Sequence, residues 1–192
     1  MSNRSPPETT APLVVVRPAA RNEQSLIEGL FQFYLYDWSE MEPAGSVAFD
    51  FNADGQFRPD PYLATYWSAE RRWPLLIQLG ERTIGFALLN THSHRGGEIE
   101  RNMAEFFVVR QHRRQGLAAA AVRRILALHP GQWEVAVAER NVVAKAFWPK
   151  ALAAANVTGL HAVEGDGEHW RGPIWRFHVG ALDAPDAAKP IE

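Results

Sequence analysis

The sequence predicts a mixed α/β fold, in which a central mixed sheet of six to seven strands is flanked by about four helices. Short apolar runs typical of buried strands alternate with longer segments whose apolar residues recur at helical spacing. Some neighbouring strands are separated by hairpin-length turns and others by a helix, so antiparallel and parallel pairs are both expected. The 192 residues, 46% of them hydrophobic and 22% charged, suit one domain with a sizeable core.

The first half of the chain is expected to alternate strands and helices. β-Branched residues before Pro18 favour a short strand, and leucine and aromatic residues at helical spacing favour a helix that ends near Trp38. Glycine and proline residues mark a long loop, and Gly80 marks a hairpin turn. In chain order, the expected elements are a disordered tail (1–12), a strand (13–17), a helix (22–38), a loop (43–61), a second helix (61–71), a hairpin (73–79 and 83–90) and a long strand (98–109).

The second half is expected to contribute two further helices and three further strands. Apolar residues spaced four, four and three apart favour a helix from Gly116 to Leu128, which Pro130 and Gly131 close. The remaining expected elements are a strand (133–138), a helix (141–152), two strands (157–163 and 174–179) and a polar, disordered tail (181–192).

The stretch from Glu105 to Leu128 has the pattern of an anion-binding strand, loop and helix. An apolar run that ends at Val109 is followed by a basic turn and then by the alanine-rich helix. The first backbone N–H groups of a helix have no intrahelical acceptor and carry partial positive charge, so a pyrophosphate fits there. Gly116 and Ala118 are small enough for a large ligand to approach the backbone. The alternative is an ordinary strand–helix connection with a surface arginine cluster.

This stretch resembles the acyl-CoA signature of the GNAT superfamily of N-acetyltransferases. The segment RRQGLA (113–118) matches Q/R-x-x-G-x-G/A, and Val109 stands where that family usually has a valine. The order of predicted elements is also the GNAT order, so the resemblance covers roughly 13–179. It implies a GNAT-like fold, a single acyl-CoA N-acyltransferase domain over 13–180 and acetyl-CoA as co-substrate. The implied CoA-binding residues are Phe107, Val108 and Val109 on the strand, and Arg113, Arg114, Gln115, Gly116, Leu117, Ala118 and Ala119 around the pyrophosphate.

A second motif, in residues 141–148, resembles N-x-x-A-x-x-F/L-Y, which often follows the fifth strand in the same superfamily. The resemblance implies that Asn141 hydrogen-bonds the CoA arm and that the last residue of the motif protonates the departing thiolate. That last residue is Trp148 rather than tyrosine, and an indole N–H is not a useful acid at neutral pH. We therefore expect Trp148 to pack against CoA or the core, which leaves the general acid unassigned.

Glu105 is the candidate general base for deprotonating an amine. It lies on the predicted strand beside two phenylalanines, and an apolar setting would raise its pKa toward neutrality. A carboxylate paired with an arginine is an equally weighted interpretation. Glu134 and Glu139, which flank the next strand, are the fallback candidates.

The end of the first predicted helix combines aromatic and acidic residues, and it also looks typical of one GNAT branch that is described mainly as predicted acetyltransferases. In one interpretation it forms a substrate-facing wall, in which Asp37 or Glu40 holds a cationic amine. In the other, the aromatic residues pack in the core and Glu40 is solvated. The candidate substrate residues are Tyr34, Asp37, Trp38 and Glu40.

Composition and charge argue against several other functions. The formal net charge of -2 disfavours a general nucleic-acid binder. The absence of cysteine excludes disulfides and cysteine-ligated zinc, and His92 and His94 have no third ligand nearby, so we expect no metal. No apolar stretch approaches membrane-spanning length and no signal-peptide pattern is present, so we expect a cytoplasmic protein without membrane contact.

Two functions remain open at this point. The first is an acetyl-CoA-dependent N-acetyltransferase that moves an acetyl group directly to an amine of a small molecule or a protein. The second is a GNAT-fold domain that binds CoA with little catalysis, as a sensor or interaction domain; Trp148 in place of tyrosine keeps it open. A monomer or a homodimer is expected in either case.

Overall fold

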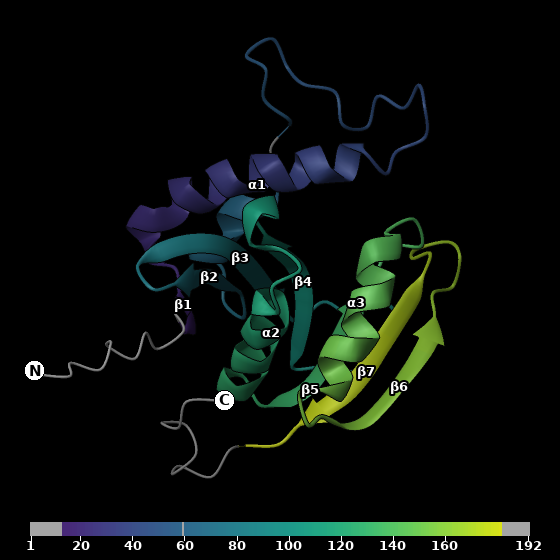
Figure 1. Cartoon of the computed structure of the whole chain (residues 1–192). Coiled ribbons are helices and arrows are strands. Elements are labelled where there is room, and N and C mark those ends of the chain that lie inside the picture. The colour runs from purple at the N-terminus through teal and green to yellow at the C-terminus, as the bar shows by residue number, and fades with distance from the viewer. Residues whose placement is uncertain (1–12, 59, 182–192) are drawn as a thin grey trace, which may run out of the picture.

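A seven-stranded mixed sheet with three α-helices packed on it forms the core of the computed structural model, which describes residues 13–58 and 60–181 (Figure 1). The strands are β1 (Val14–Pro18), β2 (Trp73–Leu79), β3 (Arg82–Asn90), β4 (Arg101–Val108), β5 (Gly131–Ala136), β6 (Thr158–Glu164) and β7 (Pro173–Val179). The α-helices are α1 (Gln24–Ser39), α2 (Leu117–Leu128) and α3 (Val142–Ala153). The tails predicted over 1–12 and 181–192 lie outside the described residues, apart from Ala181.

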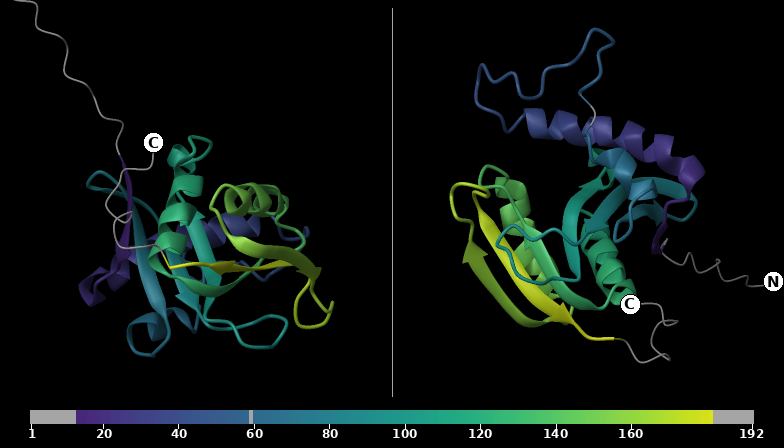
Figure 2. Two further views of the ribbon diagram at one scale, coloured as in Figure 1. Left: turned by 90° about the horizontal axis from the view of Figure 1, so that it is seen from below. Right: turned by 180° about the vertical axis from the view of Figure 1, so that it is seen from behind.

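The sheet has the strand order β1-β2-β3-β4-β5-β7-β6, which places β1 and β6 at opposite edges (Figure 2). All neighbouring strands are antiparallel except β4 and β5, which α2 connects as a crossover. The predicted mixed sheet is therefore confirmed. Among residues 13–58 and 60–181, no helix has both the length and the apolar composition needed to cross a bilayer.

Alternate side chains of the strands divide the core between the two faces of the sheet. Leu75 and Ile77 of β2 pack with buried residues of α2 and α3, whereas Leu76 between them packs with Ile27 and Phe31 of α1. This alternation follows from the two-residue period of a β-strand. The helix that carries the candidate substrate residues therefore covers the face opposite α2 and α3.

The pairing of β4 with β5 ends soon after it begins. Only Arg101 and Asn102 pair with β5, although β4 continues to Val108. A β-bulge also interrupts the pairing of β4 with β3, because Leu88 lies opposite Glu105 whereas Leu89 lies opposite Met103, which leaves Ala104 without a partner. The two parallel strands diverge beyond this point and leave an opening in the middle of the sheet.

The α-helix predicted over 61–71 is wrong, so the described residues contain three α-helices rather than about four. A short 3-10 helix, Leu63–Trp67, occupies part of this segment, and its buried Leu63 and Tyr66 pack against α1 and β3. The spacing of the apolar residues resembled that of a helix, but the run of Thr65, Tyr66 and Trp67 has poor helix propensity. The long strand expected over 98–109 also begins later, at Arg101.

Candidate active site

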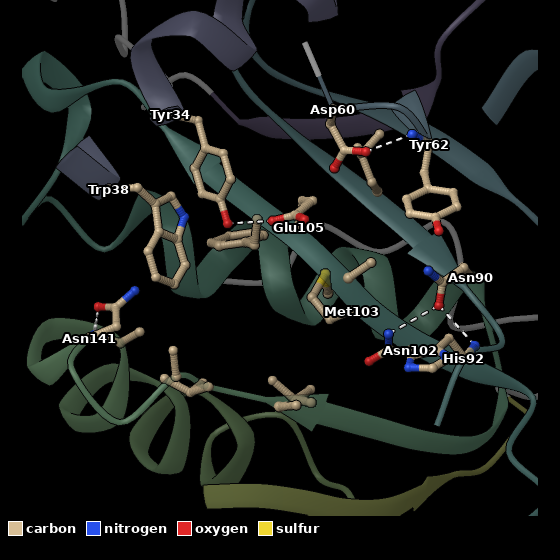
Figure 3. A pocket seen from close by; sticks show the side chains of 18 of the residues that line it. Tyr34, Trp38, Asp60, Tyr62, Asn90, His92, Asn102, Met103, Glu105 and Asn141 are labelled. Atoms are coloured by element: carbon tan, nitrogen blue, oxygen red, sulfur yellow. Dashed lines mark hydrogen bonds between the residues drawn. The ribbon is translucent and has the colours of Figure 1, made fainter. Parts of the chain in front are cut away.

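A cavity of about 820 Å³ lies at the opening between β4 and β5. It is lined by Tyr34 and Trp38 of α1, by residues 103–106 of β4 and by residues 135–138 at the end of β5 (Figure 3). Asn141 and Trp148 border it from the side of α3. The predicted base, two of the predicted substrate residues and the second motif therefore meet around one space.

Glu105 projects into this cavity from β4, and its partner is Tyr34 rather than an arginine. The Tyr34 hydroxyl donates a hydrogen bond to Glu105 Oε2, as Figure 3 shows. Burial raises the pKa of Glu105 to about 7, although the hydrogen bond from Tyr34 lowers it; the negative charge of Asp60 adds to the increase. At neutral pH, Glu105 is therefore about half ionised, which suits a group that accepts and releases a proton.

The two fallback carboxylates are held elsewhere. Glu134 has a side chain with 0% exposure, and it accepts hydrogen bonds from the side chains of Ser93 and Arg176 and from the backbone of His94. Burial alone would raise the pKa of Glu134, but hydrogen bonds with the side chain and backbone of His94, with Arg176 and with Ser93 lower it to about 2, so this carboxylate is ionised and fully occupied. Glu139 pairs with Lys145 at 2.5 Å and does not line the cavity.

Asp37 and Glu40 do not line the cavity but pair with arginines from the loop after β4. Asp37 receives hydrogen bonds from Arg113 and, at 2.8 Å, from Arg110 Nε. Glu40 pairs with Arg110 at 3.1 Å, but its side chain is 76% exposed. Of the four predicted substrate residues, Tyr34 and Trp38 thus face the cavity, whereas the two carboxylates attach α1 to the loop.

The loop and the start of α2 present free backbone amides. The first helical hydrogen bond runs from Ala120 N–H to Gly116 C=O at 3.0 Å, so the amides of residues 117–119 have no intrahelical acceptor, and no side chain caps them. Arg114 and Gly116 have positive φ values of 60° and 77°. A Cβ at Gly116 would meet no atom within 4 Å, so the space beside this backbone is open. These features fit the pyrophosphate of CoA.

The backbone of β4 next to the opening can be assigned from the register. Val109 N–H donates to Ile84 C=O at 2.9 Å, so in an antiparallel ladder Val109 and Phe107 direct their backbone groups to β3. The alternate residues, Phe106 and Val108, direct theirs to the opening. Of the three strand residues predicted to bind CoA, the geometry therefore leaves only the Val108 N–H free, because the Val108 C=O accepts a hydrogen bond from Arg113. It also adds the backbone of Phe106, which was not among the predicted residues.

Two side chains of the loop, Arg113 and Gln115, bond within the protein, whereas Arg114 is exposed. Arg113 Nε donates to Val108 C=O at 2.6 Å, and Gln115 Nε2 donates to Gln111 C=O at 2.9 Å. Arg113 therefore holds the loop in place, and the backbone amides and the Arg114 side chain remain as the groups that can meet an anion.

The second motif is also placed by its contacts. Asn141 Oδ1 accepts the Ala144 N–H at 2.9 Å and caps α3, which leaves the amide nitrogen of Asn141 available on the cavity side (Figure 3). Trp148 is buried, and its ring centroid lies 5.5 Å from that of Phe106 and 5.4 Å from that of Phe147. Trp148 thus packs between α3 and β4.

Several cavity residues were missed in the sequence. Asp60, Arg72, Asn90 and Asn102 come from different loops and strand ends and carry no common local pattern. His92 was noticed only as half of a histidine pair. No group of three or more potential metal ligands occurs in the part of the chain that the structure describes.

Comparison with known proteins gives a family for this arrangement. Residues 29–153 match the acetyltransferase (GNAT) family, which is more than half of the chain. No curated protein matches the chain significantly.

Solved structures of low sequence identity share the fold. A GNAT-family acetyltransferase from Streptococcus agalactiae is 15% identical, with a TM-score of 0.59 over 88% of this chain and 96% of that one. An acetyltransferase from Thermus thermophilus is 17% identical, with a TM-score of 0.56 over 86% and 96%. A spermidine N-acetyltransferase from Vibrio cholerae, solved with CoA and spermine, is 14% identical, with a TM-score of 0.51 over 86% and 94%. The family match and the shared fold agree, and this chain belongs to the GNAT family of acetyltransferases.

Proposed function

We propose that this protein is an acetyl-CoA-dependent N-acetyltransferase that moves the acetyl group directly to the amine of a small molecule or a protein. The observation that carries the proposal is Glu105, a half-buried carboxyl with a pKa of about 7 in the cavity where β4 and β5 diverge. A base with a pKa near the working pH is the group that an ammonium acceptor requires.

Each part of the site has a distinct task in this reaction. The free amides of residues 117–119 bind the pyrophosphate, and the backbone of Phe106 together with the Val108 N–H aligns the pantetheine arm along β4. When bound, acetyl-CoA would supply an acetyl thioester, whose carbonyl carbon would accept the amine nitrogen while the carbon–sulfur bond breaks and CoA leaves as the thiolate. Glu105 removes the amine proton, directly or through water. The CoA and spermine bound by the Vibrio cholerae structure support a cofactor and an amine meeting on this fold.

A CoA-binding domain with little catalysis is the second candidate. Trp148 favours it, because the position that the family motif assigns to a tyrosine acid is filled by a buried indole. The two candidates share the CoA site and differ in turnover.

Titration calorimetry with acetyl-CoA, with ATP and NAD as controls, tests the site that both candidates share. We expect selective micromolar binding that Gly116→Glu weakens at least tenfold, because the new carboxylate lies beside the free amides and repels the pyrophosphate. Gly80→Glu is the matched control, since Gly80 also has a positive φ and open space beside it but lies in the β2–β3 hairpin. Equal binding by wild type and Gly116→Glu would show that the pyrophosphate lies elsewhere.

A panel of amines then separates the two functions. Thiol release with one or more amines supports the enzyme, and tight CoA binding without release from any amine supports the binding domain.

A further inference from the structure

Three charged side chains line the cavity without an ion-pair partner: Asp60, Arg72 and Glu105. None of them takes part in an ion pair within residues 13–58 and 60–181. The other arginine in the lining, Arg140, is held by Glu42 at 2.7 Å. Opposite charges that share one cavity without pairing with each other leave room for a ligand that carries both signs.

The guanidinium of Arg72 is held at one end of the cavity. Arg72 directly precedes β2 and is partly buried, and its guanidinium carbon lies 5.1 Å from the centroid of the Tyr66 ring. Tyr66 is itself buried, and its hydroxyl accepts a hydrogen bond from Asn90 Nδ2 at 3.3 Å. A fixed aromatic surface therefore positions the cation before any ligand arrives.

The carboxylates lie farther along the cavity. Figure 3 shows Asp60 and Glu105 between the end formed by Tyr34 and the end formed by Asn90 and His92. Asp60 is held by its own turn, since its Oδ1 accepts the Tyr62 N–H at 2.6 Å. Tyr66 is affected by charges of both signs, because burial and the negative charge of Glu105 raise its pKa to about 12 while Arg72 opposes the increase.

The strand register gives the distance between the backbones that carry the positive charge of Arg72 and the negative charge of Glu105. Glu105 lies opposite Leu88, and Arg72 precedes Trp73, which lies opposite Leu89. Two strand spacings and about two residues along the strands therefore separate the Arg72 and Glu105 backbones by about 12 Å. The two long side chains shorten this gap to one that a small molecule can bridge.

We propose that the acceptor is a small amine that also carries a carboxylate, with its ammonium between Asp60 and Glu105 and its carboxylate on Arg72. This proposal rests on the proposed function and names the acceptor class of the same site. A guanidinium matches a carboxylate with two parallel hydrogen bonds, and it keeps its charge at every working pH. A phosphate dianion fits less well, because Asp60 and Glu105 share the cavity with only one unpaired arginine.

Matched acceptor pairs test the proposal. Acetylation rates are measured for α-amino acids and for ω-amino acids of increasing chain length, each beside its carboxamide, which keeps the amine and removes the negative charge. We expect wild type to favour the carboxylates in kcat/KM by about tenfold to a hundredfold. Arg72→Gln should bring this ratio close to one, and Arg72→Lys should restore part of it. Arg71→Gln is the control, because it removes the same charge from the exposed neighbour and should leave the ratio unchanged.

Calorimetry with the same pairs in the presence of CoA provides a readout that does not require turnover. Turnover that favours the carboxamides, or a carboxylate preference that survives Arg72→Gln, overturns the acceptor class and leaves the proposed function intact. Carboxylate binding that depends on Arg72, with no turnover of these acceptors or of any amine in the panel, supports the anion site and overturns the proposed function. If these acceptors show neither turnover nor Arg72-dependent binding, the acceptor class is overturned, and the amine panel decides the proposed function separately.

Discussion

Replacing Glu105 with glutamine tests the proposed base through the pH dependence of the rate. With a pKa of about 7, Glu105 is about one-tenth ionised at pH 6 and about nine-tenths ionised at pH 8. The wild-type rate, corrected for the ionisation of the acceptor itself, should therefore rise about tenfold between these pH values. An exposed carboxyl with a pKa near 4.5 would give almost no change over the same interval.

Glu105→Gln keeps the shape of the side chain but cannot accept the proton. We expect kcat/KM at pH 8 to fall by about 100- to 10,000-fold, the usual contribution of a positioned base, and the inflection near pH 7 to disappear. Thiol release measured from pH 5.5 to 9 gives both results in one experiment.

Tyr34→Phe is the companion variant, because it changes the pKa of the base without removing the base. The hydrogen bond from Tyr34 stabilises the ionised form of Glu105 and lowers its pKa, so its loss should move the inflection above pH 7. An inflection that persists in Glu105→Gln, or one that moves to lower pH in Tyr34→Phe, would refute the assignment of the base.

Two further predictions concern residues that support the site. Asp37→Asn should weaken acetyl-CoA binding about threefold to tenfold in calorimetry, because it releases Arg110 and Arg113. Glu40→Gln removes a carboxylate from an exposed ion pair and should change the binding less than twofold. Equal effects of the two substitutions would count against the role of Asp37 in holding the loop. Glu134→Gln should lower the free energy of unfolding at pH 7 by about 3 kcal/mol in urea denaturation, because Arg176 loses its buried partner. Because the folded-state pKa of Glu134 is about 2, the carboxylate stabilises the fold above about pH 4.5, and this stabilisation is lost as the pH falls toward 2. A difference in unfolding free energy between wild type and Glu134→Gln that stays constant from about pH 4.5 to about pH 2 would contradict the role of the ionised carboxylate.

Strands β2 and β7 were predictable because apolar residues dominate each of them and each has a clear end. The predicted strand over 73–79 coincides with β2, and that over 174–179 differs from β7 by one residue. The start of β4 and the segment 61–71 were less predictable, because there the chain is held by tertiary contacts of Ile99 and Tyr66 rather than by local periodicity.

The site was predictable only where one local segment carries it. The strand, loop and helix around Gly116 form a continuous motif, and Glu105 directly precedes it, so both could be recognised. The pairing of Asp37 with Arg110 and Arg113 joins residues 73 and 76 positions apart, and no local pattern indicates it. Arg72 was missed for the same reason, since its role depends on a cavity formed by separate strand ends.

The contacts of α1 have a consequence for protein engineering. Tyr34 and Asp37 lie three residues apart on this helix, so one helical turn holds both the proposed base and the loop at the pyrophosphate site. A library that randomises this turn to alter acceptor preference would also disturb the cofactor side. Leu35 and Trp38 line the cavity but pair with neither Glu105 nor the arginines of the loop, so they are the positions where acceptor preference can be varied with Tyr34 and Asp37 kept constant.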